Sequence, residues 1–200
     1  MDSSLVEFDK QFFLTLNGSH HEFLDYIMLV ASSLFSFAPV FLLSIYFLVK
    51  YIKKQDDYYY TFINIALLIS ILTIQYFLCR YFLESIFKAV CYREKPCESP
   101  DISSFVRLLN IDCFTTNHSF FSFKSCLMFC VTSFLFSTIK EGFVGFKFVL
   151  ILWAILVGYS RIYVGSHYPL NVFISAITGV TVGYLISKLY FYLKNNVLVI

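Results

Sequence analysis

Long apolar stretches separated by short polar ones run through most of this chain. A peptide group inside a bilayer must find its hydrogen bond within its own segment, so a helix that crosses about 30 Å of hydrocarbon needs about 20 apolar residues. Five segments meet that requirement, approximately Tyr26–Val49, Tyr58–Cys79, His118–Ile139, Phe143–Tyr159 and Leu170–Tyr192. The pattern predicts an all-α fold, a polytopic membrane bundle of about five transmembrane helices over residues 26–192.

Residues 3–17, ahead of the first span, have helical periodicity. Their apolar positions are Leu5, Val6, Phe8, Phe12, Phe13 and Leu16. Polar residues such as Glu7 and Lys10 oppose them, so we expect an amphipathic helix that lies along the membrane interface and ends near Asn17. The connections between the apolar segments are short and contain no linker. Residues 1–200 are therefore expected to form a single domain.

The composition agrees with a membrane protein. Hydrophobic residues make up 58% of the 200 residues and charged residues only 14%, against roughly one quarter charged in soluble domains. The expected surroundings are a lipid bilayer, and no nucleic-acid partner is expected. Gly179 and Gly183 form a small-xxx-small pair in the last span, which suits close helix packing inside the monomer or in a homodimer.

Basic residues indicate how the bundle is oriented. One group follows the first span or flanks the later ones: Lys50, Lys53, Lys54, Lys140, Lys147, Lys188 and Lys194. By the positive-inside rule this group is cytoplasmic, which leaves residues 89–117 and 160–169 on the exoplasmic face. Abundant Phe, Tyr, Ile, Lys and Asn favour an AT-rich bacterial genome, and hence the bacterial cytoplasmic membrane.

The exoplasmic face carries more positive charge than the topology rule favours. Its basic residues are Lys88, Arg93, Lys95, Arg107 and Arg161. An anionic ligand bound on that face is the simplest explanation for this excess.

The six cysteines divide by location. Cys79, Cys126 and Cys130 fall within predicted spans, where a thiol is most simply a small buried apolar group. Cys91, Cys97 and Cys113 belong to the exoplasmic segment, where one disulfide could form, and the sequence does not choose the pair. No metal or other cofactor is expected, because the histidines lack close Cys/His ligand spacing.

Three segments carry candidate chemistry, and the first includes Lys88 and Lys95-Pro96. Two lysines at this spacing could both contact one phosphate, although snorkelling to lipid headgroups would explain them equally well. Arg80, Glu84 and Lys88 follow at i, i+4 and i+8 on a helix. Glu84 is thus expected to pair with Arg80 and orient Lys88, or to belong to a stabilising surface stripe.

The second segment, Thr115-Thr116-Asn117-His118, opens the third predicted span. Helix N-termini bind anions through their unpaired N–H groups, and His118 could protonate a departing alkoxide. Ordinary N-capping by Thr116 or Asn117 is the alternative.

The third segment runs from Ser160-Arg161 to His167 and Asn171. Arg161 offers a planar fork for phosphate oxygens, and His167 is suited to attack phosphorus if a partner holds its second ring nitrogen. Asn171 follows one helical turn later, and Pro169 suits the first turn of the fifth span. The alternative is that Arg161 simply faces lipid phosphates.

In order and spacing these segments resemble the motifs of the type 2 phosphatidic acid phosphatase superfamily of membrane lipid phosphatases. That family's pattern is Lys, six residues, Arg-Pro; Pro-Ser-Gly-His; and Ser-Arg, five residues, His, three residues, Asp. The resemblance implies a metal-independent enzyme in which His167 is the nucleophile that forms a phosphohistidine and His118 is the general acid. It implies a phosphate-binding set at Lys88, Lys95, Thr116, Asn117, Ser160 and Arg161.

Three departures from the family pattern bear on activity. Lys95 stands where the family has arginine, Asn117 replaces glycine, and Asn171 replaces the aspartate that orients the nucleophile. The predicted function is a lipid phosphate or diphosphate phosphatase acting at the exoplasmic face, on undecaprenyl diphosphate or a phospholipid for example. The alternative is a catalytically impaired pseudophosphatase that serves as a lipid-binding or structural subunit of a membrane complex. Lys124, within the third predicted span, could snorkel outward or reach a lipid diphosphate, and the sequence does not choose between the two.

Overall fold

The computed structural model describes residues 3–52, 58–109, 120–139 and 144–196. All regular structure in these ranges is helical, as the sequence predicts. In chain order the elements are α1 (Ser3–Gly18), α2 (Glu22–Ser32), η1 (Leu34–Ser36), α3 (Phe37–Ile52), α4 (Tyr58–Phe77), the π-helical turn η2 (Leu78–Leu83), α5 (Glu84–Val90), η3 (Ser103–Phe105), α6 (Phe123–Thr138), α7 (Val144–Tyr163) and α8 (Pro169–Asn196).

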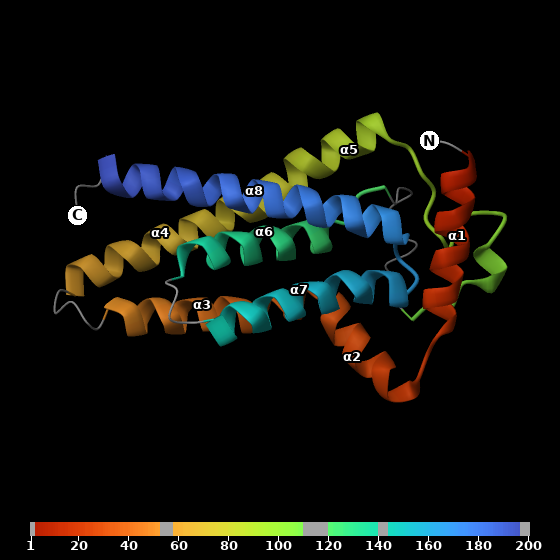
Figure 1. Cartoon of the computed structure of the whole chain (residues 1–200), viewed down its shortest axis with the longest axis horizontal. Coiled ribbons are helices and arrows are strands. Elements are labelled where there is room, and N and C mark those ends of the chain that lie inside the picture. The colour runs from red at the N-terminus through yellow and green to blue at the C-terminus, as the bar shows by residue number, and fades with distance from the viewer. Residues whose placement is uncertain (1–2, 53–57, 110–119, 140–143, 197–200) are drawn as a thin grey trace.

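The long helices α3, α4, α6, α7 and α8 run lengthwise beside one another, and α1 crosses one end of the bundle (Figure 1). At that end α7 passes to α8 and α1 contacts both. The C-terminal end of α8 lies at the opposite end, together with the end of α3 and the start of α4. Within the described ranges, residues expected on the exoplasmic face and those expected in the cytoplasm thus lie at opposite ends of the bundle.

Among the described residues, three helices are long and apolar enough to cross a membrane: Ile65–Val90, Val144–Tyr163 and Pro169–Leu193. The pair Glu22–Ser32 and Leu34–Tyr46 would make a fourth span if counted together, but it is bent by 80°. The remaining apolar helix, α6, has only 16 residues. Five apolar segments are helical as predicted, whereas the count of five full spans is not confirmed.

The first predicted span, Tyr26–Val49, is interrupted rather than continuous. Ser33 leaves the helical conformation (φ −77°, ψ 169°), and its hydroxyl donates to the Val30 carbonyl at 2.7 Å. Serine competes with helical hydrogen bonding in this way, so the Ser32-Ser33 pair is a natural place for a break. The second predicted span is longer than expected, because its helix continues past Cys79 through η2 and α5 to Val90.

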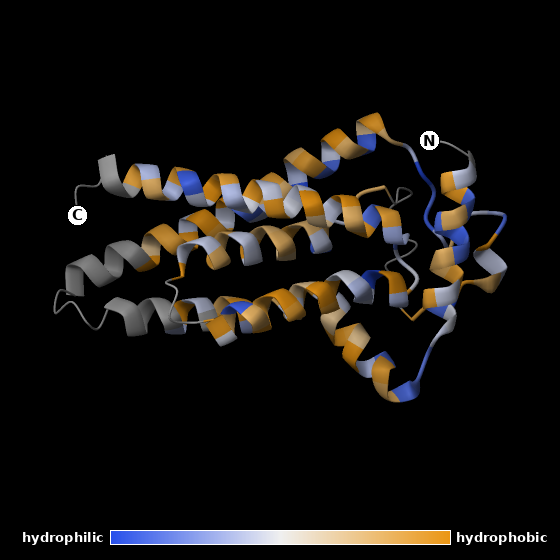
Figure 2. Ribbon diagram, in the orientation of Figure 1, coloured by the Kyte–Doolittle hydropathy of each residue, from blue (hydrophilic) through white to orange (hydrophobic). Residues whose placement is uncertain are grey.

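The short helix α6 forms the centre of the bundle. Ten of its 16 residues are buried, and it packs chiefly against α8 and α7. Figure 2 shows apolar residues along the long helices. Many of them are exposed, as expected for helices that face lipid; Leu42, Ile74, Phe148 and Leu185 are examples.

Two glycines allow α8 to approach α6 closely. A Cβ at Gly179 would collide with the Cys126 carbonyl oxygen, and one at Gly183 with the Cys130 carbonyl oxygen. The small-xxx-small pair therefore serves packing inside the monomer, which was one of the two interpretations of the sequence.

The N-terminal helix α1 forms close to its predicted bounds but turns an unexpected face inward. Asp9, Phe13 and Asn17, one turn apart from each other, are almost fully buried, while Phe8 and Phe12 are exposed. The two polar members of this stripe contact the end of the bundle that holds the predicted site residues. Whether α1 lies along the membrane interface stays a prediction.

We predict that Gly183→Ala lowers the free energy of unfolding by about 1–3 kcal/mol, because the added methyl group forces two helix backbones apart. Gly145→Ala is the matched control, since a Cβ there meets nothing within 4 Å. Unfolding of the purified protein in detergent, followed by circular dichroism against denaturant, measures both. Equal stability of the two variants would contradict the close α6–α8 packing.

Candidate active site

The turn between α7 and α8 holds Arg161 and His167 together. Arg161 lies in the last turn of α7, and its carbonyl oxygen accepts the N–H groups of Ser166 and His167, each at 3.1 Å. Gly165 has φ 83° and donates to the Ile162 carbonyl at 3.0 Å. This is the Schellman pattern of a helix end, in which glycine takes the left-handed conformation. Arg161 is 4% exposed and His167 is 8% exposed.

The guanidinium of Arg161 reaches the C-terminal end of α2. Its Nη1 donates to the Ser32 hydroxyl and to the Ser32 carbonyl oxygen, the latter at 3.2 Å. Lys124 Nζ donates to the same carbonyl oxygen at 2.9 Å. Carbonyl groups at a helix C-terminus lack intrahelical partners and carry partial negative charge, so this end attracts cations. Arg161 is thus inside the bundle, and the alternative that it faces lipid phosphates is wrong.

Asn171 is fully buried in the first turn of α8, and Arg93 holds its side chain. Arg93 Nη1 donates to Asn171 Oδ1 at 3.2 Å and to Asp9 Oδ2 at 2.6 Å. Because arginine only donates, this contact identifies the amide oxygen as the atom facing Arg93. Asp9 Oδ1 also accepts the Leu170 N–H at 2.9 Å, so α1 fixes the start of α8.

Tyr168 supports the same arrangement. The Arg93 guanidinium lies 3.6 Å from the centre of its ring, and the ring packs edge-on against Phe13 of α1. Burial raises the pKa of the Tyr168 phenol above its ordinary value, and a smaller, opposing effect comes from its hydrogen bond with Ser99. Arg93 and Ser99, which follow α5, thereby hold Tyr168, the residue next to His167.

The other predicted phosphate-binding residues that the structure describes differ in their burial and in their contacts. Lys95 is 3% exposed and precedes Pro96. Lys88 is less buried and pairs with Glu84 at 2.9 Å, while Glu84 also pairs with Arg80 at 2.7 Å, as the i, i+4 and i+8 spacing predicts. Ser160 is fully buried and its hydroxyl donates to the Val157 carbonyl at 2.7 Å.

Thr116, Asn117 and His118 lie outside the described residues, and so does Cys113. The chain just before α6 nevertheless contacts both other segments. Phe121 stacks on Phe87 of α5 with ring centroids 4.7 Å apart. The Ser122 N–H donates to Ser175 Oγ at 2.8 Å, and Ser175 Oγ donates to the Asn171 carbonyl oxygen at 2.7 Å.

A second polar cluster braces the site from the side of α1 and α2. The Asn17 amide donates to the carbonyl oxygens of Arg107 (3.0 Å) and Tyr163 (2.9 Å) and accepts the Arg107 N–H at 2.8 Å. The Arg107 guanidinium makes a two-pronged contact with Asp25, which also accepts the Tyr163 hydroxyl at 2.7 Å. These contacts join α1, α2 and the end of α7.

Four residues in this region were not singled out as site residues from the sequence. Arg93 is one of the basic residues that are in excess on the predicted exoplasmic face, and that excess could have identified it. Asp9 and Asn17 are polar residues on a helix whose inward face the sequence pattern did not reveal. Ser32 carries no motif signal at all.

Cys97 is disulfide-bonded, whereas Cys91 is free. This removes Cys91 from the three candidates for the exoplasmic disulfide. Cys79, Cys126 and Cys130 are free and buried, as expected, and the Cys126 and Cys79 sulfur atoms lie 3.6 Å apart.

One family model and two known proteins are similar to this chain. Residues 67–195 match the PAP2 superfamily. A lipid A 4'-phosphatase of Porphyromonas gingivalis is 26% identical over 194 residues, which cover 96% of this chain and 77% of that protein. The crystal structure of Aquifex aeolicus LpxE superposes with a TM-score of 0.61 at 26% identity, covering 89% of this chain and 93% of the other.

The chain belongs to the PAP2 superfamily, since the match covers well over half of its length. This confirms the resemblance inferred from the three motifs and agrees with the prediction of an integral membrane phosphohydrolase. The comparisons give no support to the pseudophosphatase alternative.

We predict that Asn17→Ala lowers the free energy of unfolding by about 2 kcal/mol or more, because it strands buried backbone groups of Arg107 and Tyr163. Gln11→Ala, an exposed change on the same helix, is the control. Thermal unfolding in detergent measures the difference. If both variants unfold at the same temperature as the wild type, the Asn17 amide does not stabilise this part of the structure.

Proposed function

We propose that the protein is a metal-independent lipid phosphatase in which Arg161 binds the phosphate and His167 attacks it. The observation that carries this proposal is the α7–α8 turn, which buries Arg161 and His167 and joins them by a hydrogen bond from the His167 backbone N–H to the Arg161 carbonyl oxygen. Burial strengthens the attraction between Arg161 and a phosphate, and the fixed turn supplies orientation before substrate arrives.

In the first step, a ring nitrogen of His167 attacks phosphorus and the bond from phosphorus to the lipid oxygen breaks. His118 gives its proton to the departing alkoxide. Arg161 stabilises charge on the equatorial oxygens, assisted by Lys88, Lys95, Thr116 and Ser160 and by the backbone at Asn117. The products of this step are the dephosphorylated lipid and a phosphohistidine.

In the second step, water attacks the phosphohistidine and the phosphorus–nitrogen bond breaks. His118, now neutral, accepts a proton from the water, and inorganic phosphate leaves. Both histidines then return to their starting states. The described residues that follow His118 in the chain, Phe121 and Ser122, contact α5 and α8.

Asn171 occupies the position from which the family aspartate orients the nucleophile. In a serine protease, replacing such an aspartate by asparagine costs about 10⁴ in rate, because the amide favours the wrong tautomer of the histidine. Here Arg93 faces the amide oxygen, which fixes the amide in one of its two orientations. The amide oxygen has two lone pairs, so it can accept from an imidazole N–H as well as from Arg93, which is the contact that the family aspartate makes.

The proposed substrate is a lipid carrying a phosphate or diphosphate at the exoplasmic face of a bacterial cytoplasmic membrane. The similarity to a lipid A 4'-phosphatase supports a phosphate attached to a sugar-containing lipid as one candidate. Undecaprenyl diphosphate and phospholipids such as phosphatidate remain candidates of the same chemistry. We further propose that residues 1–200 form one domain, with α1 at the interface and five membrane-crossing helices.

We expect purified protein to release phosphate from at least one of lipid A, undecaprenyl diphosphate, phosphatidate and phosphatidylglycerophosphate in the presence of chelator. His167→Ala should lower kcat by at least about 10⁴, because the covalent route is lost. Lys147→Ala, near the opposite end of the bundle, is the control and should keep wild-type activity. If the wild type released no phosphate from any lipid of the panel, the proposal that the protein is a phosphatase would be refuted.

Asn171→Asp should raise kcat, since a carboxylate stabilises the imidazolium form of His167 and can still accept from Arg93. Phosphate release by wild type, Asn171→Asp and the double variant Asn117→Gly with Asn171→Asp decides between the two functions. Turnover in the wild type supports the phosphatase. Turnover in the double variant alone would instead support the pseudophosphatase.

A further inference from the structure

Arg80 is a cation well inside a membrane-spanning helix. It belongs to the span Ile65–Val90 and lies ten residues before its end, which is about 15 Å along the helix axis. Its side chain is 42% exposed, and the neighbouring Phe77 and Tyr81 are exposed as well. An ionisable group at such a position is costly beside lipid, so it commonly marks a functional contact.

Two cations share one carboxylate on this helix. Arg80 Nη1 lies 2.7 Å from Glu84 Oε2, and Lys88 Nζ lies 2.9 Å from Glu84 Oε1. The three side chains together therefore carry one positive charge in excess. A guanidinium has five N–H donors, of which the contact with Glu84 uses one. The exposed part of Arg80 can thus donate to a further anion.

Phe123 connects Arg80 to Tyr76. The guanidinium carbon of Arg80 lies 5.2 Å from the centre of the Phe123 ring. The same ring packs edge-on against Tyr76, with the two centroids 5.5 Å apart. The cation is thereby held over an aromatic ring within η2, and π-helical turns are frequent at functional sites.

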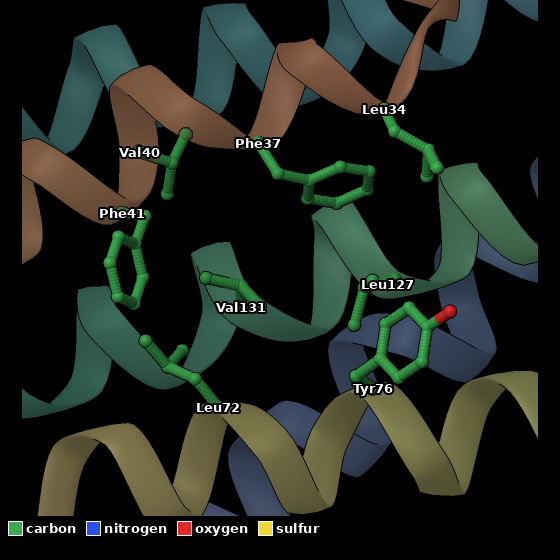
Figure 3. Close-up of a pocket in the computed structure, with 8 residues that line it drawn as sticks. All are labelled: Leu34, Phe37, Val40, Phe41, Leu72, Tyr76, Leu127 and Val131. Atoms are coloured by element: carbon green, nitrogen blue, oxygen red, sulfur yellow. The ribbon is translucent and has the colours of Figure 1, made fainter.

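An apolar groove begins at Tyr76. It is a cavity of about 250 Å³ between η1 and α3 on one side, α4 on another and α6 at its base. Figure 3 shows Tyr76, Leu34 and Leu127 at one end of the groove and Phe41 toward the other. Leu34 and Phe41 are 60% and 40% exposed, which leaves the groove open toward the surrounding lipid.

The cation and the groove follow each other in the order of a phospholipid. The helix that contains Tyr76 and Arg80 runs toward the end of the bundle that holds the α7–α8 turn (Figure 1). Arg80 therefore lies beyond the groove on the side of that end. A chain in the groove would run from Arg80 toward the opposite membrane face, which is how the chains of a lipid run from its phosphate.

We propose that Arg80 and the groove together bind an anionic phospholipid of the bilayer. Its phosphate accepts hydrogen bonds from the Arg80 guanidinium, and one of its acyl chains lies in the groove between α3, α4 and α6. The charge selects the headgroup, since a zwitterionic lipid brings its own cation, whereas the apolar walls favour any alkyl chain.

This lipid site differs from the candidate active site in the cation that it uses. Tyr76, where the groove ends, is four residues from Arg80 but twelve from Lys88, so the headgroup meets Arg80 first. Glu84 contacts both cations and repels an anion that would bridge them. The bound lipid is therefore a component of the bilayer rather than the substrate attacked by His167, and its site lies outside the proposed function.

The competing interpretation is that Arg80 only pairs with Glu84 and stabilises the helix. Both interpretations keep the ion pair, but only the proposed one makes the choice of lipid depend on Arg80. An anionic lipid is therefore compared with a zwitterionic one. Phosphatidylglycerol and phosphatidylcholine suit this purpose, because their phosphates are diesters, which the proposed hydrolysis of terminal phosphates does not consume.

Trp153 provides the signal, since it is the one tryptophan of the chain. Its Nε1 donates to the Ser36 carbonyl at 2.9 Å, directly before Phe37 in the wall of the groove. Bromine atoms on an acyl chain quench nearby indole fluorescence. The purified protein in detergent is titrated with either lipid carrying brominated chains, and the lipid concentration at half-maximal quenching measures its binding.

We expect the wild type to bind brominated phosphatidylglycerol about tenfold more tightly than brominated phosphatidylcholine, the effect of one charge-assisted contact. Arg80→Gln should remove this preference by weakening the anionic lipid alone, and Arg80→Lys should keep most of it. Lys188→Gln, which removes a lysine that lies over Tyr184 in another span, is the control and should change nothing. Equal binding of the two lipids by the wild type, a preference that survives in Arg80→Gln, or an equal loss in Lys188→Gln would overturn the role of Arg80.

Competition separates this lipid site from the candidate active site. Butylphosphonate has a phosphate-like group that suits the proposed active site but no long chain, so it should leave quenching by brominated phosphatidylglycerol unchanged. Displacement of the lipid would place it in the active site and overturn a separate lipid site. A lipid preference that depends on Arg80, without phosphate release from any lipid of the panel, would reject the proposed function alone.

A second arm tests the groove and does not depend on folding of the arginine variants. Leu72→Phe fills part of the groove, so it should weaken binding of both brominated lipids about tenfold. Ile74→Phe, on the exposed side of the same helix, is the control. Equal effects of the two phenylalanine variants would reject the groove as the site of the acyl chain.

Discussion

The carbonyl group of Arg161 is the constraint on which the site depends. By accepting the N–H groups of both Ser166 and His167, it closes the end of α7 and returns the chain toward α8. The position of the histidine is thereby set by backbone geometry rather than by side-chain packing alone. Gly165 is needed for this turn, because its φ of 83° is a conformation in which most residues are strained.

Two ion pairs lie close to this turn. Asp9 neutralises Arg93 and Asp25 neutralises Arg107, and each pair fastens a different part of the N-terminal region to the end of the bundle. Arg161 and Lys124 also meet at the Ser32 carbonyl oxygen, so α6 and α7 are both joined to the end of α2.

Much of this organisation follows from the sequence. Hydropathy predicted the helical segments, the i, i+4 spacing predicted the contacts of Glu84 with Arg80 and Lys88, and the glycine pair predicted the close approach of α8 to a neighbour. The motif spacing predicted the superfamily and the α7–α8 turn as its centre. These features are local, or they depend on patterns that a single segment displays.

Features that depend on several elements at once were not predictable. The helical period of residues 3–17 reveals an amphipathic helix but not that Asp9 and Asn17 face protein instead of water. The break at Ser33 arises from one hydroxyl group within an otherwise apolar run, so hydropathy alone treats the segment as continuous. The meeting of Arg161 and Lys124 at Ser32 requires that break, since the carbonyl group becomes accessible only where α2 ends.

The short central helix has a consequence for the depth of the polar end of the bundle. At 1.5 Å per residue, the 16 residues of α6 span roughly 24 Å, which is less than the hydrocarbon thickness of about 30 Å. Its two ends cannot both reach the headgroup layers of an undeformed bilayer. Because the neighbouring helices enclose α6, an end that stops short of the headgroups is surrounded by protein rather than by lipid, which is the condition under which backbone can leave the helical conformation at that depth.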